Sequence, residues 1–240
     1  MKKSNLITLI LSLILAACTG TKCSKKNKLA NETETFLSEK TKEGLYHYED
    51  VSASDESKID TILNHYQNID LENRDSTFLK IYYLNLYELM FIKQIASHQP
   101  IAYITDVKDF FTKKIFTIDA KSYSMNSLRK QKIKPLFSNP SYLLLIPYGG
   151  YSDHCFDGKP FVQQEFNEQT KSKLIRILSD NKFIRIKPAS ELILIPELFL
   201  WFKEEFGDTS QVRQYINKHR EELPNNYKIE YYPWSWKVKL

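Results

Sequence analysis

The chain has 240 residues, of which 34 are basic and 29 acidic, so that its formal net charge is +5. A balance this mild, with no basic run after residue 30, argues against nucleic acid as a partner. About 205 residues follow the N-terminal segment, which is enough for one domain with a well-packed core. Its most apolar stretch, residues 78–96, is interrupted by charged and amide side chains and does not predict a membrane span.

Residues 1–17 have the parts of a bacterial lipoprotein signal peptide. Lys2 and Lys3 precede an apolar run, residues 6–17, which is shorter than the roughly 20 residues that cross a bilayer. The small residues before Cys18 resemble a lipobox, where the chain is cut before the cysteine and the thiol is acylated, for example with palmitate. We therefore expect lipid on Cys18 to anchor the mature chain in the bacterial cell envelope, facing the periplasm. An ordinary secretory signal with a coincidental cysteine is the alternative.

Residues 18–50 are expected to form the lipidated N-terminus and a flexible tether, and residues 51–240 the domain. The start of the tether has four lysines and no acid, which is typical of a solvated segment but would also suit contact with anionic headgroups. These lysines are Lys22, Lys25, Lys26 and Lys28. Cys23 and Cys155 could form a disulfide in an oxidising compartment, or both could remain thiols.

The first half of the domain is mainly helical in its apolar spacing. Residues 54–68 have one apolar stripe, and residues 76–98 have apolar side chains around nearly the whole helix, which predicts a position at the centre of the core. Two short strands, residues 115–119 and 122–124, surround a turn. Ser124 or Asn126 is then expected to cap a short helix that runs toward Lys134.

The second half mixes short strands with helices. Strands are predicted over residues 142–147, 183–186, 192–195 and 227–236, and helices over residues 161–179, 196–207 and 210–220. The order lacks the alternation of strand and crossover helix that marks a parallel sheet. The sequence therefore predicts an α+β fold, as a single domain with several helices packed on a small, mainly antiparallel sheet.

Five short segments, in order over residues 82–236, resemble the pattern of the domain-of-unknown-function family 547. They are Asn85-Leu86-Tyr87, His98-Gln99-Pro100 with residues 104–107, Tyr123-Ser124-Met125-Asn126, residues 201–207, and Tyr232-Pro233-Trp234-Ser235. The family pattern also contains a Glu-His pair, a further histidine and two cysteines. We interpret these as a thiol nucleophile with an imidazole base.

This chain departs from that pattern at the reactive positions. Arg129 and Lys130 fall where the family has Glu-His, Leu143 falls at its histidine, and Tyr148 falls at its first cysteine. The scaffold positions agree with the family, namely Tyr87, Pro100, Trp201, Gly207 and Trp234. The resemblance therefore implies a retained fold with substituted chemistry, as in a pseudoenzyme.

Cys155 is the remaining candidate for catalysis, with His154 beside it, although adjacent side chains usually diverge. The alternative is a half-buried thiol in an irregular loop next to a surface histidine. Asp153, His154 and Asp157 are loosely similar to a zinc site, but no second cluster completes the ligand set. We accordingly expect neither a metal nor a cofactor.

The substituted positions could line a ligand pocket, for which the candidate residues are Asn85, Tyr87, Arg129, Lys130 and Tyr148. The two cations, Arg129 and Lys130, would suit a small anionic ligand such as a phosphate or carboxylate. The alternative is that both are solvated on the surface of a helix and bind no ligand. The aromatic C-terminal segment is more typical of core than of a sugar or peptide site.

The predicted function is that of an envelope lipoprotein whose domain is a binding or assembly module without catalysis. Its expected partners are the membrane, through lipid on Cys18, and either another envelope protein or a small anionic ligand. The alternative is a cysteine-dependent hydrolase or thiol oxidoreductase that uses Cys155.

Overall fold

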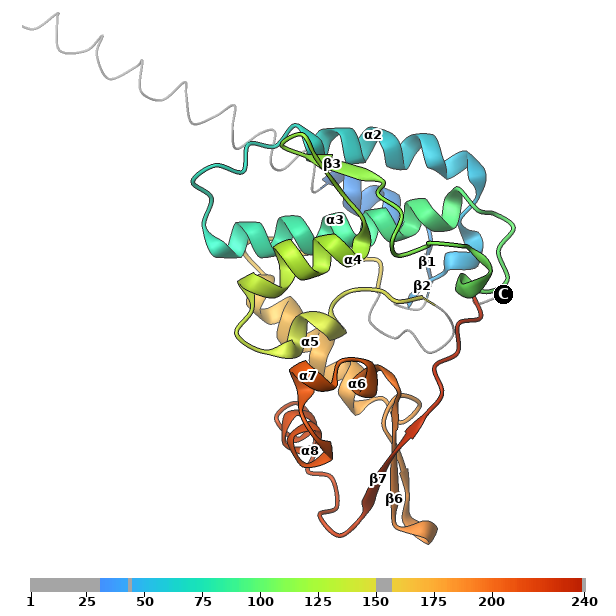
Figure 1. Cartoon of the computed structure of the whole chain (residues 1–240), viewed down its shortest axis with the longest axis vertical. Helices are drawn as coiled ribbons and strands as arrows, with labels where there is room; N and C mark the ends of the chain where they lie inside the picture. The colour runs from blue at the N-terminus through green and yellow to red at the C-terminus, as the bar shows by residue number, and fades with distance from the viewer. Residues whose placement is uncertain (1–30, 43–44, 150–156, 239–240) are drawn as a thin grey trace, which may run out of the picture.

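A computed structural model describes residues 31–42, 45–149 and 157–238 (Figure 1). The expected signal peptide lies outside the described residues, as do Cys18, Cys23, His154 and Cys155. No helix in the described ranges is both long enough and apolar enough to cross a membrane.

The core is built around α3 (Ser76–Ala96), which is buried on nearly every side. Asp75 caps its first turn by accepting a hydrogen bond from the backbone N–H of Phe78 at 2.8 Å. α2 (Glu56–Gln67) packs along it through an apolar stripe that includes Ile59, Leu63 and Tyr66. Both helices are confirmed as the apolar spacing predicted them, because apolar residues at helical spacing lie on the face of the helix that is buried.

The segment before α2 belongs to the domain, which corrects the expected boundary of the tether at residue 50. Residues 31–38 are helical, and β1 (Thr41–Lys42) pairs with β2 (Leu45–Tyr46). Phe36, Leu37 and Tyr46 are buried in the core. The five large apolar side chains of residues 31–50, at positions 36, 37, 45, 46 and 48, follow neither a helical nor an alternating period, so the sequence pattern alone indicates a tether.

A hairpin and a capped helix follow α3. β3 (Phe116–Ile118) pairs with β4 (Lys121–Tyr123), and both turn residues, Asp119 and Ala120, have positive φ, as a two-residue hairpin requires. The Ser124 hydroxyl accepts from the backbone N–H of Ser127 and so begins α4 (Met125–Leu128). The helix continues as the π-helical η4 (Arg129–Ile133) and the 3-10 turn η5 (Lys134–Leu136).

The apolar run at residues 142–147 is not the buried strand that its composition predicts. Its first part belongs to a 3-10 helix, η6 (Pro140–Leu144). Asn139 caps the backbone N–H of Ser141 at 2.9 Å, and Pro140 has the fixed φ that suits a first helical position. A short, wholly apolar run does not distinguish a buried strand from a buried helix, so the local capping residues decide the conformation.

The C-terminal half contains a three-stranded sheet. β5 (Arg185–Lys187) is antiparallel to β6 (Leu192–Pro196), which pairs in parallel with β7 (Lys228–Tyr232). α5 (Phe166–Ser179) precedes the sheet. Between β6 and β7, the single helix predicted over residues 196–207 is interrupted at Phe202, giving α6 (Leu198–Trp201) and α7 (Lys203–Phe206), followed by α8 (Thr209–Asn217).

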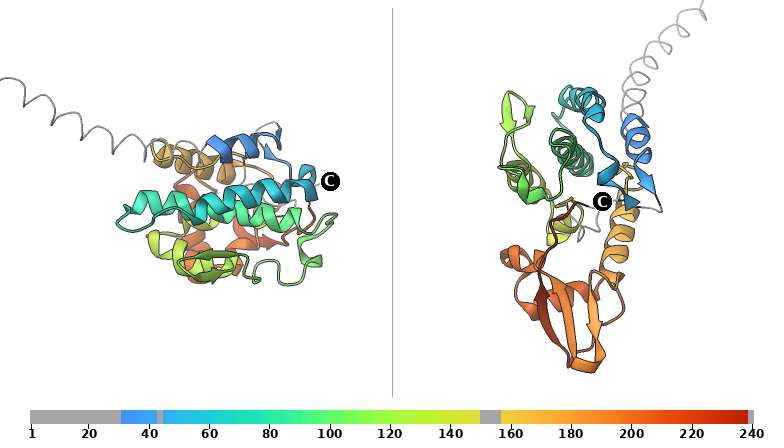
Figure 2. Two further views of the ribbon diagram at one scale, coloured as in Figure 1. Left: turned by 90° about the horizontal axis from the view of Figure 1, so that it is seen from above. Right: turned by 90° about the vertical axis from the view of Figure 1, so that its right-hand side faces the viewer.

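These elements form an α+β single domain, as predicted. In the right-hand view of Figure 2, β3, β4 and α4 lie on one side of α3, whereas β1, β2 and α5 lie on the other. The three-stranded sheet lies at the far end from α2 (Figure 1). After β7 the chain returns to the helical end, where the Ile104 N–H donates to the Trp236 carbonyl at 3.0 Å and the Val238 N–H donates to the Ala102 carbonyl at 2.9 Å.

Candidate functional site

Two of the predicted pocket residues, Arg129 and Tyr148, meet at the ring of Phe202. The guanidinium carbon of Arg129 lies 4.7 Å from the centroid of that ring, and the Tyr148 ring centroid lies 5.7 Å from it. Arg129 is 6% exposed. Phe202 comes to this position because the chain breaks between α6 and α7 there, with φ −113° and ψ 37°.

The second cation near Arg129 is Lys134 rather than the expected Lys130. Lys134 Nζ lies 2.9 Å from a carboxylate oxygen of Glu205, and the Tyr142 hydroxyl donates to the same oxygen at 3.5 Å. Burial raises the pKa of Tyr142, and the charge of Glu205 adds to this rise, whereas Arg129 and Lys134 oppose it. Lys130 points to solvent. Lys134 is thus paired with Glu205, whereas Arg129 contacts the Phe202 ring and acts on Tyr142.

An aromatic cluster continues from Phe202 to the C-terminal segment. We define it as Tyr148, Trp201, Phe202, Trp234 and Trp236. The rings of Trp201 and Trp236 stack with centroids 5.2 Å apart and an interplanar angle of 11°. Trp201 is nevertheless 39% exposed, so the cluster reaches the surface and is not core alone. The expectation that the terminal aromatic residues build core holds for Trp234, which is buried.

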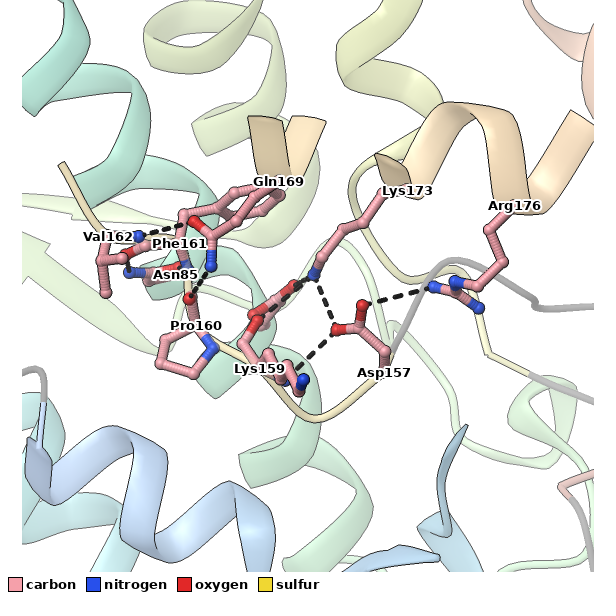
Figure 3. Close-up of polar contacts among 10 residues, drawn as sticks. Asn85, Asp157, Lys159, Pro160, Phe161, Val162, Gln169, Lys173 and Arg176 are labelled. Carbon is pink, nitrogen blue, oxygen red and sulfur yellow. Dashed lines mark hydrogen bonds and ion pairs between the residues drawn. The ribbon is translucent and has the colours of Figure 1, made fainter. Parts of the chain in front are cut away.

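Asn85, in contrast, belongs to a polar cluster between α3 and α5 (Figure 3). Its side-chain amide donates to the Phe161 carbonyl at 2.9 Å and accepts from the Phe161 N–H at 2.8 Å. Tyr87, two positions further along α3, is fully buried, as is Leu143 in η6. The structure therefore divides the predicted pocket residues between core, surface and two separate sets of contacts.

Lys173 is the centre of the polar cluster, although no sequence pattern predicts a role for it. Its ammonium lies 2.9 Å from Asp157, donates to the Lys159 carbonyl at 3.2 Å and lies 4.0 Å from Glu88 (Figure 3). It is also 4.4 Å from the centroid of the Phe161 ring. Both Lys173 and Glu88 are buried. Glu88 lies in the apolar surface of α3, and Lys173 lies in that of α5. A charged residue in each of two otherwise apolar helix faces is the sequence signal that could have indicated the contact between them.

The remaining members of the cluster fix the chain after residue 156. Arg176 lies 3.5 Å from Asp157. The Gln169 side chain accepts from the Val162 N–H at 2.9 Å and donates to the Pro160 carbonyl at 3.1 Å (Figure 3). Two carboxylates and two cations balance each other, and they hold residues 157–162 against two helices. The arrangement is that of a structural clamp.

The loosely zinc-like set of the sequence falls mainly outside the described ranges, because Asp153 and His154 are not described and only Asp157 is. No group of three or more His, Cys, Asp or Glu residues in the described ranges could hold a metal ion. Asp157, which the sequence placed in a loosely zinc-like set, instead contacts Lys173 and Arg176. Comparisons with family models, curated proteins and solved structures find no match to this chain. A functional hypothesis thus depends on the residues and contacts themselves.

Proposed function

We propose that this chain is a lipid-anchored protein of the bacterial cell envelope whose domain binds or assembles with a partner and has no catalytic activity. The observation that carries this proposal is the packing at the positions that the resemblance to family 547 assigns to reactive residues. Leu143 is fully buried, Tyr148 packs within the aromatic cluster, and Arg129 lies on the Phe202 ring. Side chains that fill the core in this way support a binding fold.

The charge near this position favours an anionic partner. Lys134 pairs with the carboxylate of Glu205, and Arg129 lies close enough to Lys134 to act on it electrostatically. Trp201, the residue before Phe202, is 39% exposed. A guanidinium and an ammonium attract phosphate or carboxylate groups, and an exposed indole adds apolar contact area.

The lipid anchor is tested by metabolic labelling of a bacterial culture with a palmitate analogue, followed by mass analysis of the N-terminal peptide. We expect label on Cys18 of the native chain and none on a Cys18→Ala variant. The matched control is Cys23→Ala, which removes a nearby thiol and should keep the label. Label that persists in Cys18→Ala, or a mature N-terminus elsewhere, would contradict the anchor.

The absence of catalysis is tested by the reactivity of Cys155. A thiolate nucleophile has a lowered pKa and alkylates fast near neutral pH. In a Cys23→Ala background we expect Cys155 to react no faster in the native chain than in the urea-unfolded chain. Faster alkylation in the native chain, with a rate that falls in mild acid, would favour a cysteine-dependent hydrolase or thiol oxidoreductase and refute the binding proposal.

A further inference from the structure

One segment of the domain carries basic residues and no acidic ones. Residues 120–152 contain no Asp or Glu, whereas the net charge of the whole chain is only +5. The cations of this segment are Lys121, Arg129, Lys130, Lys132 and Lys134. In the structure they lie on β4, η4 and η5, and α4 joins β4 to η4 and contacts both.

Three of these lysines pair with no carboxylate in the described ranges. Lys121 and Lys132 lie with their ammonium groups 5.3 Å and 5.7 Å from the centroid of the same ring, that of Tyr123. Lys121 also donates to Gln131 at 2.8 Å, and Lys130 is exposed. Within the described ranges, no ion pair joins any of the three to an acid. An ammonium over the face of a tyrosine ring is attracted to that ring and keeps its positive charge.

Exposed apolar side chains adjoin this basic segment. Leu200 is 46% exposed and Trp201 is 39% exposed, both at the end of α6. The contacts of Arg129 with Phe202 and of Lys134 with Glu205 join the basic segment to α6 and α7. In the right-hand view of Figure 2, the green segment with β4 and α4 and the orange segment with α6 and α7 lie on the same side of the molecule.

We propose that this basic and aromatic face, defined as Lys121, Lys130, Lys132, Leu200 and Trp201, docks the domain onto a bilayer with anionic headgroups. Exposed tryptophan and leucine side chains suit the boundary between headgroups and acyl chains, where indole rings are enriched. Lysines near the bilayer are attracted by anionic lipids. Lys121 and Lys132 meet at the Tyr123 ring, whereas Lys130 is exposed and makes no contact with that ring in the described ranges. Charges divided in this way fit a layer of headgroups better than a single small anion.

The acids on this face are few. Glu205 is paired with Lys134, and Glu204 is exposed beside the equally exposed Lys203. Burial raises the pKa of Tyr83, Lys132 opposes this rise, and the charge of Asp119 adds to it, so Asp119 also reduces the potential near Lys132. The excess of cations remains. This inference deepens the proposed function, because lipid on Cys18 would hold the domain beside a bilayer, but docking itself does not require that lipid.

The test uses the mature chain, residues 18–240, with Cys18→Ser so that no lipid is attached. Its sedimentation is measured with vesicles of phosphatidylglycerol and phosphatidylcholine, and with vesicles of phosphatidylcholine alone. We expect partitioning onto the anionic vesicles only, with a blue shift of tryptophan emission that a Trp201→Phe variant reduces. Lys130→Gln should weaken partitioning about fivefold, and Leu200→Gln should weaken it as well. The matched control is Lys171→Gln, at an exposed position on α5 on the other side of α3, and it should partition as the unsubstituted chain does.

Two results would overturn the proposal. One is an equal loss of partitioning for Lys130→Gln and Lys171→Gln, because it would assign binding to diffuse charge. The other is binding of soluble glycerol phosphate without any partitioning onto vesicles, because it would assign the face to a free anion. Either result leaves the lipid anchor intact, since that is read from the label on Cys18. Conversely, loss of the label on Cys18 leaves the docking result unchanged.

Discussion

The side-chain amide of Asn85 forms two hydrogen bonds with the backbone of Phe161, a residue 76 positions later in the chain, at 2.9 Å and 2.8 Å. An Asn85→Ala substitution should leave the buried N–H and carbonyl of Phe161 without partners. We expect a loss of about 2 to 4 kcal/mol in the free energy of unfolding, measured by urea denaturation. Asn225→Ala, at an exposed position, is the control and should change stability by less than about 0.5 kcal/mol. An equally small loss for Asn85→Ala would show that the anchor is not required.

Lys173 should be more costly to remove, because it lies between the carboxylates of Asp157 and Glu88. Replacing one member of a buried ion pair costs about 3 to 5 kcal/mol, since the other charge stays buried. We therefore expect Lys173→Met to reduce stability by this amount in urea denaturation. The double variant Lys173→Met with Glu88→Gln should lose less than the sum of the two single variants. If the losses in the free energy of unfolding were additive, the Lys173 ammonium would stabilise the fold only through Asp157 and the Lys159 carbonyl, and not through Glu88.

The residues that the sequence placed correctly are those whose position depends on local pattern. The buried faces of α2 and α3, the turn at Asp119 and the cap at Ser124 each follow from side chains within a few positions. The strand predicted over residues 142–147 was wrong because its cap, Asn139, outweighs an ambiguous apolar run. The break at Phe202 was missed because no proline or glycine marks it.

At the candidate site, likewise, local sequence pattern does not predict which residues distant in the sequence make contact. Arg129 and Tyr148 were singled out from the resemblance to family 547, and they do share the Phe202 ring. That Lys134, and not Lys130, joins Arg129 depends on the π-helical turn of η4, which shifts the faces of the following residues. The contact of Lys173 with Asp157 depends on the packing of a chain segment against α5, which a single sequence does not encode as a local pattern.

Gly149 has a conformation that a side chain would disturb. Its φ is +79°, and a Cβ atom there would lie 2.5 Å from the Phe91 ring. Its carbonyl also accepts from the Trp234 indole at 3.0 Å. We expect Gly149→Ala to cost about 1 to 3 kcal/mol of stability in urea denaturation. Phe91→Leu added to Gly149→Ala should cost less than the two changes taken separately, because the smaller side chain relieves the contact. A double variant without that relief would show that backbone strain alone causes the loss.

Asp55 is expected to contribute a pH-dependent part of the free energy of unfolding. Burial opposes ionisation of this carboxyl, but hydrogen bonds from Ser52 and Lys40 outweigh it, so that the pKa of Asp55 lies below its ordinary value of 3.8. Because the pKa of Asp55 is lower in the folded than in the unfolded chain, the ionised carboxylate stabilises the fold. This stabilisation is complete above the pKa of the unfolded state and is lost as the pH falls through the pKa of the folded state.

At neutral pH we therefore expect Asp55→Asn to reduce the free energy of unfolding by about 2 kcal/mol, because charge-assisted hydrogen bonds to Ser52 and Lys40 are weakened. Urea denaturation at a series of pH values should show the native chain and the variant converging as the pH falls through the lowered pKa of Asp55, below which both side chains are neutral. Glu34→Gln, at an exposed position, is the control and should follow the native chain throughout. A difference between Asp55→Asn and the native chain that stays constant into acid would mean that the shape of the cap, and not the charge of Asp55, stabilises this end of α2.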